Sequence, residues 1–115
     1  MRDCLFCQIA AKIAPTILTY EDASVVAFAD LHPQAPVHQL IIPKKHIATM
    51  NDIVPQEEAL IGHLYTVAAL LAKKNACAAT GYRVVMNCNE QGGQAIYHLH
   101  LHLFGGKQLH WPPGC

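Results

Sequence analysis

The segment GGQAIYHLHLHLFGG, residues 92–106, places three histidines in strict alternation with leucines. Residues two apart in a β-strand point to the same face, so His98, His100 and His102 are expected to project together, with the leucines opposite. Such a row has the form of an amphipathic strand with a polar outer face. Three imidazoles in succession nevertheless favour a functional interpretation, because imidazole is the side chain that changes charge near neutral pH.

Two kinds of chemistry use a row of imidazoles. Neutral imidazoles can share a zinc ion that keeps one open position. Alternatively, one imidazole attacks phosphorus while a neighbour holds the phosphate oxygens. The loop NEQGGQ before the row supplies backbone N–H groups and glycines, Asn87 adds a neutral donor, and no carboxylate lies in the row. These surroundings favour an anion, and metal binding by the row remains the alternative.

The elements that position this row are predicted to form an antiparallel α+β sheet. Helices are expected over 4–12 and from Pro55 to a stop at Gly81, and a loop over 31–39. Strands are expected over 16–22, 24–30, 39–43, 82–89 and 97–106. Short links between successive strands favour this arrangement over a doubly wound parallel sheet.

Composition limits the classes of partner. The chain has 115 residues, 52% of them hydrophobic, which predicts one domain over residues 1–115. Its formal net charge of zero and the lack of a basic run argue against polymeric nucleic acid, although a mononucleotide stays open. No apolar run reaches the length of a membrane span, and no secretory signal is recognisable. Five cysteines without framework spacing then predict reduced thiols and a cytoplasmic location.

HLHLHLF has the His-apolar-His-apolar-His-apolar-apolar form that defines the histidine triad superfamily. FADLHPQAPVHQLIIPKKHI, GYRVVMN and the terminal HWPPG resemble its Hint branch, the histidine triad nucleotide-binding proteins. The resemblance runs from about Leu5 to the end of the chain. It implies a HIT-like fold with one long and one short helix and a sheet continued across a homodimer. It also implies hydrolysis of adenosine or guanosine 5′-phosphoramidates and of aminoacyl-adenylates, without a cofactor for catalysis.

The resemblance assigns catalytic roles to four histidines. His100 would attack the α-phosphate and form a nucleotidyl-histidine, which water then cleaves. The backbone carbonyl of His98 would hold the other ring nitrogen of His100 as N–H. His102 would contact phosphate oxygens, and His38 would support the triad. A histidine at a junction of loop and strand is the alternative for His38.

The resemblance also implies a nucleotide pocket. Asp30 matches the ribose-binding acid, and its alternative is a turn-forming aspartate. The residues around the base would be Leu5, Phe6, Ile9, Phe28, Leu31 and Leu40, with ordinary core as the alternative. The residues near the phosphate would be Asn87, Gly93, Gln94, Ala95 and His102.

Two features bear on turnover. Many family members have a serine where this chain has Ala95, and that hydroxyl is associated with the scissile P–N bond and the departing amine. A non-catalytic nucleotide-binding or scaffold protein is therefore the alternative function. Trp111, in the terminal HWPPG, is expected to reach toward the partner subunit's site on the leaving-group side. Its alternative is a stiff apolar tail.

Cys4 and Cys7 form a C-x-x-C, a common chelating spacing for zinc. Two thiolates do not close a tetrahedral site, so two more ligands must come from elsewhere in the chain. Bacterial relatives in the superfamily imply His46, after PKK, and His98 as those ligands, in a structural zinc site. Two reduced cysteines on a helix are the alternative.

Overall fold

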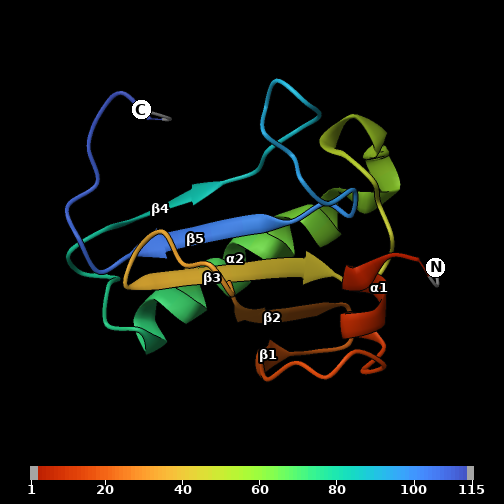
Figure 1. The fold of residues 1–115 in the computed structure, drawn as a ribbon, viewed down its shortest axis with the longest axis horizontal. Coiled ribbons are helices and arrows are strands. Elements are labelled where there is room, and N and C mark those ends of the chain that lie inside the picture. The colour runs from red at the N-terminus through yellow and green to blue at the C-terminus, as the bar shows by residue number, and fades with distance from the viewer. Residues whose placement is uncertain (1–2, 114–115) are drawn as a thin grey trace.

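A computed structural model describes residues 3–113. Gly114 of the HWPPG motif and Cys115 lie outside the described residues. The strands are β1 (Leu18–Glu21), β2 (Val25–Ala29), β3 (Val37–Pro43), β4 (Tyr82–Val85) and β5 (Leu101–Gly105). They form one antiparallel sheet in the order β1-β2-β3-β5-β4 (Figure 1). The predicted antiparallel α+β class is confirmed.

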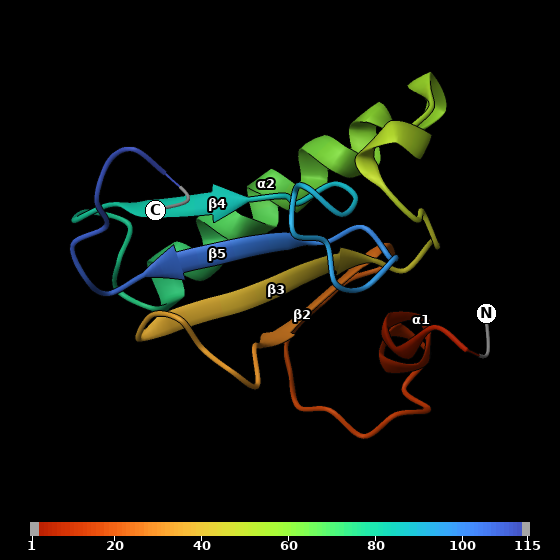
Figure 2. The same ribbon diagram turned by 45° about the horizontal axis from the view of Figure 1, so that its top comes forward.

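Two helices pack on the sheet, the short α1 (Leu5–Ala10) and the long α2 (Glu58–Lys74), with 3₁₀ turns η1 (Met50–Asp52) and η2 (Pro55–Glu57) before α2. In Figures 1 and 2, α2 runs behind the sheet and α1 lies in front of it. The sheet is thus covered by a long helix on one face and only partly by a short helix on the other. None of the helices found within residues 3–113 has the length and apolar character to cross a membrane.

Because successive strand residues point to opposite faces, the buried residues form two clusters, one on each face of the sheet. On β2, Val25 and Ala27 belong to the cluster under α2, whereas Val26 and Phe28 pack with Phe6 of α1. The same alternation on the last strand sends its leucines to the α2 cluster, which includes Leu99, Leu101 and Leu103. The histidines between these leucines therefore face the side that α1 covers only in part.

The strand boundaries differ from the predicted ranges, because β1, β2, β4 and β5 are shorter than expected and β3 is longer. β3 begins at Val37 rather than residue 39, because Val37 pairs with Gly105 and the His38 carbonyl accepts from the Asp30 N–H. His38 is thus a strand residue and not part of the loop predicted over 31–39. β5 begins only at Leu101, because the Leu99 N–H donates to Ile47 outside the strand ladder.

The long helix also differs at both ends. Pro55 begins the 3₁₀ turn η2, and α2 starts only at Glu58. The helix ends at Lys74, where the Asn75 side chain donates to the Leu71 carbonyl at 2.8 Å. Gly81 is therefore not the helix stop that the sequence predicts. It lies just before β4 with a φ of +113°, a backbone conformation that glycine adopts easily.

His63 lies on α2, outside its apolar stripe, and would be expected to be solvated. Instead its Nε2 contacts the carboxylate of Asp22, in the turn between β1 and β2. That carboxylate also accepts from the Tyr20 hydroxyl and from the backbone N–H groups of Ser24 and Val25. Burial opposes ionisation of Asp22, but these hydrogen bonds outweigh it and hold the pKa of Asp22 far below its usual range.

We expect Asp22→Asn to lower the free energy of unfolding at pH 7 by about 1–2 kcal/mol, since charge-assisted hydrogen bonds become neutral ones. The pKa of Asp22 is lower in the folded chain than in the unfolded chain. Its stabilisation is therefore complete above the unfolded pKa, near 4, and declines as the pH falls below that value. Urea unfolding of both proteins from pH 7 to pH 3 measures this. An equal difference at pH 7 and pH 3 would contradict it.

Candidate active site and metal centre

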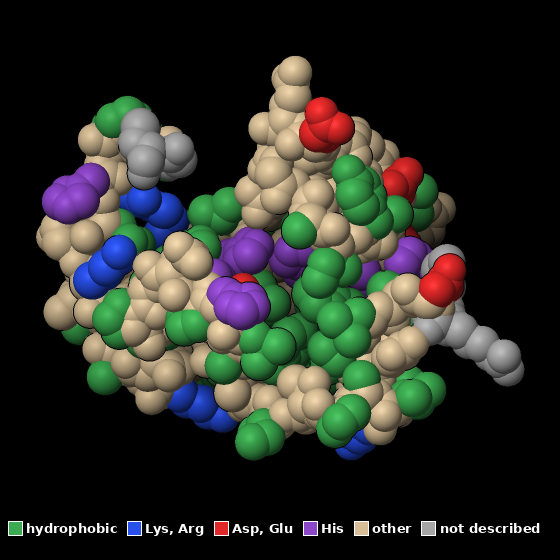
Figure 3. Space-filling view, viewed as in Figure 1, with side chains coloured by type: hydrophobic (Ala, Val, Ile, Leu, Met, Phe, Trp, Pro, Cys, Tyr) green, Lys and Arg blue, Asp and Glu red, His purple; other side chains and the backbone are tan. Residues whose placement is uncertain are grey.

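Histidine side chains are gathered on the face that α1 leaves open (Figure 3). The rings of His100 and His102 have their centroids 5.0 Å apart, and Phe6 of α1 meets His100 edge-on at 5.1 Å. His38 on β3 lies beside His102, with centroids 5.2 Å apart. The sheet brings these three histidines together, because β3 and β5 are neighbours with Leu40 opposite His102.

One backbone hydrogen bond orients His100. Its Nδ1 lies 2.8 Å from the His98 carbonyl oxygen, which can only accept, so Nδ1 carries the proton. In the neutral ring, Nε2 then holds the lone pair. Burial lowers the pKa of His100 despite this hydrogen bond, which favours the neutral ring. A neutral imidazole with Nε2 unprotonated has the form needed for nucleophilic attack.

A second chain of hydrogen bonds orients His102. The Gln34 N–H donates to Nδ1 of His38 at 3.1 Å, so a neutral His38 carries its proton on Nε2. That Nε2 lies 2.9 Å from Nδ1 of His102. His102 must then carry its own proton on Nε2, where it can be donated to an anion. Burial, with the nearby His100 and His38, lowers the pKa of His102 to about 4.

Asp30 follows β2, and its two carboxylate oxygens contact different residues, His32 and His38. Its Oδ1 accepts from the His32 N–H at 2.8 Å, which is a turn-forming contact. Its Oδ2 lies 3.4 Å from Nε2 of His38. One carboxylate oxygen therefore shapes the turn and the other faces the histidine cluster, beside the hollow described next.

An apolar hollow of about 540 Å³ lies between α1 and the strands β2 and β3. Asp30 lines it together with all six apolar residues predicted to surround a base: Leu5, Phe6, Ile9, Phe28, Leu31 and Leu40. Six further residues line the hollow and were not predicted from the sequence: Pro15, Thr16, Ile17, Ala29, His32 and Ile96. Ile17 lies outside the helices and strands and is 89% exposed, so no periodicity marks it.

The loop before β5 is held by its own side chains. Gln94 is buried, its Nε2 donates to the carbonyls of Ala48 and Ile96, and its Oε1 accepts from the Asn89 N–H. Asn87 donates to the Gly92 carbonyl at 2.7 Å. Gly93 has a φ of +80°, and Ala95 is exposed. The amides of Gln94 and Asn87 therefore fix the shape of the loop in this structure.

A second hollow, of about 600 Å³, lies on the other side of the histidines, over β4 and β5. His102 lines it, and the segment after β5 forms one wall through Lys107, Leu109 and Pro113. Arg83 of β4 lines it as well and donates to the His110 carbonyl of that segment at 2.8 Å. Trp111 is 82% exposed and does not line this hollow in the single chain.

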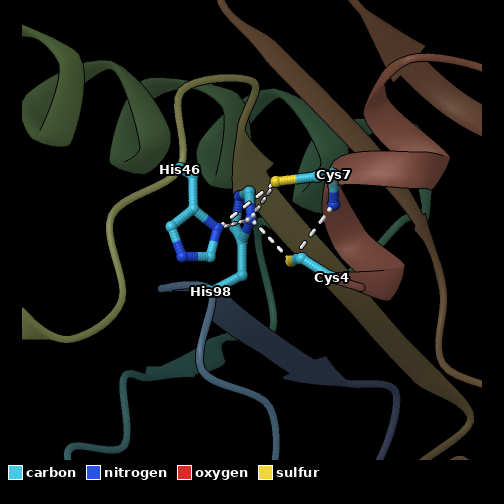
Figure 4. Close-up of side chains that lie close together, drawn as sticks. All are labelled: Cys4, Cys7, His46 and His98. Carbon is cyan, nitrogen blue, oxygen red and sulfur yellow. Dashed lines mark hydrogen bonds between the residues drawn. The ribbon is translucent and has the colours of Figure 1, made fainter. Parts of the chain in front are cut away.

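A compact cluster on the α1 side of the sheet is formed by Cys4, Cys7, His46 and His98 (Figure 4). Sγ of Cys7 lies 3.3 Å from Nδ1 of His46 and 3.4 Å from Nδ1 of His98. Sγ of Cys4 lies 3.4 Å from Nδ1 of His98, and the two Nδ1 atoms are 3.2 Å apart. The cysteines come from the start of α1 and the histidines from the segments after β3 and before β5.

Comparison with known proteins identifies the family. A family model described as the HIT domain matches residues 11–109. The chain belongs to the HIT domain family. The purine nucleoside phosphoramidase of Escherichia coli is 45% identical over 105 residues, which cover 91% of this chain and 88% of that protein. An uncharacterized HIT-like protein of Synechococcus elongatus is 46% identical over 113 residues, or 97% of each chain.

Solved structures support the same assignment. A HIT family hydrolase from Legionella pneumophila superposes with a TM-score of 0.95 at 49% identity, covering 97% of this HIT domain and 100% of that chain. A histidine triad protein from Clostridium difficile gives a TM-score of 0.92 at 43% identity, with 95% of each chain covered. The family resemblance and the HIT fold predicted from the sequence are therefore confirmed.

The Cys and His cluster of this HIT domain fits a tetrahedral zinc ion. Zinc bonds of about 2.0–2.3 Å place neighbouring ligand atoms about 3.3–3.8 Å apart, close to the separations in the cluster. Nε2 of His98 donates to the Pro43 carbonyl at 2.8 Å, so Nδ1 is left with its lone pair toward the cysteines. Burial lowers the pKa of His98 to about 4, which keeps the ring neutral, as a ligand must be.

Proposed function

We propose that this HIT domain hydrolyses the P–N bond of adenosine or guanosine 5′-phosphoramidates, and of related aminoacyl-adenylates. The observation that carries the proposal is the orientation of His100, whose Nδ1 is held by the His98 carbonyl while Nε2 stays free. It is supported by the 45% identity to the Escherichia coli purine nucleoside phosphoramidase.

The purine base is proposed to occupy the apolar hollow beside α1, where aliphatic and aromatic side chains can pack against it. Asp30 lines that hollow next to the histidines, which supports its Oδ2 as the proposed acceptor of hydrogen bonds from the ribose hydroxyls. With the base and ribose bound there, the α-phosphate is proposed to lie at His100 and His102. In this arrangement Nε2–H of His102 donates to a phosphate oxygen and stabilises the charge that develops there.

The reaction proceeds in two displacements. Nε2 of His100 attacks the α-phosphorus, a new P–N bond forms to the ring, and the original P–N bond breaks as the amine leaves with a proton taken from solvent water. A second water molecule then attacks the same phosphorus and gives a proton back to solvent. The bond to His100 breaks, and the nucleoside monophosphate is released with His100 neutral again. The His98 carbonyl stabilises the ring while it carries the nucleotidyl group.

A second candidate function is nucleotide binding without turnover, and Ala95 favours it. The residue is exposed at the end of the loop before the histidines and offers no hydroxyl to the departing amine. Amines leave poorly unless they gain a proton in the transition state. The binding hollow and the histidines would then serve recognition of a nucleotide alone.

A homodimer and a structural zinc ion complete the proposal. β4 is a sheet edge, and its Tyr82 is 40% exposed, so a second copy is proposed to continue the sheet there. Zinc is proposed to bind the cluster of Cys4, Cys7, His46 and His98. The ion would link the start of α1 to the segment after β3 and the segment before β5. The metal is structural in this proposal, because His100 is not one of its ligands.

Hydrolysis of an adenosine phosphoramidate with a fluorescent leaving amine tests the function. We expect turnover by the wild type and release of AMP, with kcat/KM of at least about 10⁴ M⁻¹s⁻¹, typical of enzymes on good substrates. Calorimetry with AMP is run alongside. Micromolar binding of AMP without any turnover would contradict the enzyme and support the non-catalytic alternative.

A further inference from the structure

Cys4 and Cys7 are close enough to each other for a disulfide to join them. They have the spacing C-x-x-C, and their sulfur atoms lie within 4.8 Å of each other. The Cys7 N–H donates to Sγ of Cys4 at 3.4 Å, so the Cys4 side chain is directed toward Cys7 (Figure 4). A disulfide brings two sulfur atoms to about 2.05 Å, and the C-x-x-C pairs of thiol–disulfide oxidoreductases close over this spacing. Movement of the two side chains is therefore enough to form the bond.

The same two cysteines are accessible to a small oxidant, since both are only partly buried. Cys77 differs, because it is 1% exposed in the core under α2. Cys88 is partly exposed in the loop before β5, but it does not belong to the cluster of Cys and His side chains. Oxidation to an internal disulfide is therefore expected at Cys4 and Cys7, and Cys88 serves as a comparison.

In the proposed zinc site both sulfur atoms are ionised, because a thiol that coordinates a metal loses its proton. The thiolate, and not the thiol, is the form that attacks an oxidant. Zinc has no redox chemistry of its own, so the electrons must come from the sulfur atoms. A structural zinc site of this composition is therefore also a pair of reactive thiolates.

We propose that Cys4 and Cys7 form a redox-sensitive pair, whose oxidation by hydrogen peroxide releases zinc and weakens nucleotide binding. One thiolate attacks an oxygen of the peroxide, the O–O bond breaks, and a sulfenic acid and hydroxide form. The second thiolate attacks the sulfenic sulfur, the S–S bond forms, and a second hydroxide leaves. Two sulfur atoms are oxidised, the peroxide is reduced to two waters, and solvent supplies two protons. The inference rests on the zinc site proposed above.

Release of the metal follows from the number of ligands that remain. A disulfide offers no thiolate, so only the imidazoles of His46 and His98 would be left, two ligands short of a tetrahedral site. The start of α1 then loses its link to the segment after β3 and the segment before β5. Oxidation therefore frees α1 from the part of the chain that carries both histidines.

The position of α1 matters for the nucleotide because Phe6 lies between the two cysteines in the sequence. Its ring meets those of His98 and His100 edge-on, with centroids 6.0 and 5.1 Å apart. Leu5, Phe6 and Ile9 of α1 all line the apolar hollow. When α1 leaves this position part of the time, the fraction of chains ready to bind falls. We expect the Kd for AMP to rise about fivefold, as when about one chain in five keeps α1 in place.

Treatment of zinc-loaded wild type with a slight excess of hydrogen peroxide tests the pair. The tryptic peptide of residues 3–12 contains both cysteines and no other, so a disulfide lowers its mass by two hydrogens. A chromogenic chelator measures the zinc that is released, and calorimetry measures the affinity for AMP before and after treatment. We expect about one zinc ion released per disulfide. A dithiol reductant with added zinc should restore the affinity.

Two variants control the treatment. Cys88→Ser removes the partly exposed cysteine outside the cluster and should respond to peroxide as the wild type does. Cys7→Ser cannot form the disulfide, so its affinity for AMP should be the same before and after treatment. This comparison is made within one variant, so it does not depend on whether Cys7→Ser binds AMP as tightly as the wild type.

The outcomes separate this inference from the proposed reaction. A peptide that stays reduced, or that carries sulfinic or sulfonic acid instead of a disulfide, overturns the pair. A complete disulfide with unchanged AMP affinity overturns the link to the nucleotide site. A reduced wild type that takes up no zinc overturns the zinc site and this inference together. If the reduced protein neither binds AMP nor hydrolyses a phosphoramidate, the proposed function fails, while peptide mass and zinc release still decide the disulfide.

Discussion

Replacing His100 with alanine is expected to abolish phosphoramidate hydrolysis, with kcat/KM reduced by at least about 10⁴-fold. The variant removes the nitrogen to which the nucleotidyl group is proposed to be transferred, and we expect no other ring to replace it. Nδ1 of His102 is occupied by His38, and Nδ1 of His98 lies in the Cys and His cluster. Losing a nucleophile costs this much because the remaining groups stabilise charge but form no covalent intermediate.

His110→Ala provides the matched control for His100→Ala. It removes an exposed imidazole whose residue contributes only its carbonyl to Arg83, so full activity is expected. AMP affinity measured by calorimetry should change less than tenfold in His100→Ala, because the base hollow and Asp30 stay intact. A wild-type reaction quenched during turnover should yield a nucleotidyl group on the peptide that contains His100. Residual turnover above about 1% in His100→Ala would show that another group is the nucleophile.

The histidine row was predictable because period-two alternation is a local property of a strand. It correctly separated the leucines, which pack under α2, from His100 and His102, which face the site. It holds for His98 as well, although His98 precedes β5, because Phe6 of α1 lies against His98 as it does against His100. Alternation gives only the face, however, and the contact of His98 with Cys4 and Cys7 was named through family resemblance.

Residues that act through the backbone or through distant segments could not be predicted in the same way. Gln34 fixes the His38 ring with its N–H, a group that every residue except proline carries. Arg83 and Lys107 are 24 positions apart in the sequence and meet at one pocket only because β4 and β5 are neighbours. The apolar residues of the base hollow were named through family resemblance, since each has the composition of ordinary core.

His98 belongs both to the proposed zinc site and, through its carbonyl, to the proposed catalytic site. Its Nδ1 faces the cysteines, its Nε2 donates to Pro43, and its carbonyl accepts from His100. These three contacts hold His98 in place, and its carbonyl orients the ring of His100, the proposed nucleophile. A ligand set that includes His98 would therefore hold the start of α1 and the approach to β5 in one position, which is a structural role with an effect on the active site.

Zinc at this centre is expected to be stoichiometric, with about one ion per chain by mass spectrometry of the purified protein. Cys7→Ser should lose it, because a serine hydroxyl does not ionise to replace a thiolate. If the ion stabilises the fold by about 3 kcal/mol, the melting temperature of this 115-residue chain falls by roughly 10–15 °C. Prolonged chelation of the wild type should lower it by a similar amount.

Cys88→Ser is the matched control for Cys7→Ser. It makes the same exchange at a free, partly exposed cysteine outside the cluster, so metal content and melting temperature should stay at wild-type values. Cys4→Ser should behave like Cys7→Ser, because both sulfur atoms lie within 3.4 Å of Nδ1 of His98. Equal melting temperatures for wild type, Cys4→Ser and Cys7→Ser, with no zinc in any of them, would instead identify two reduced cysteines at the start of α1. The hydrogen bond from His98 to Pro43 would then orient His98 without help from a metal.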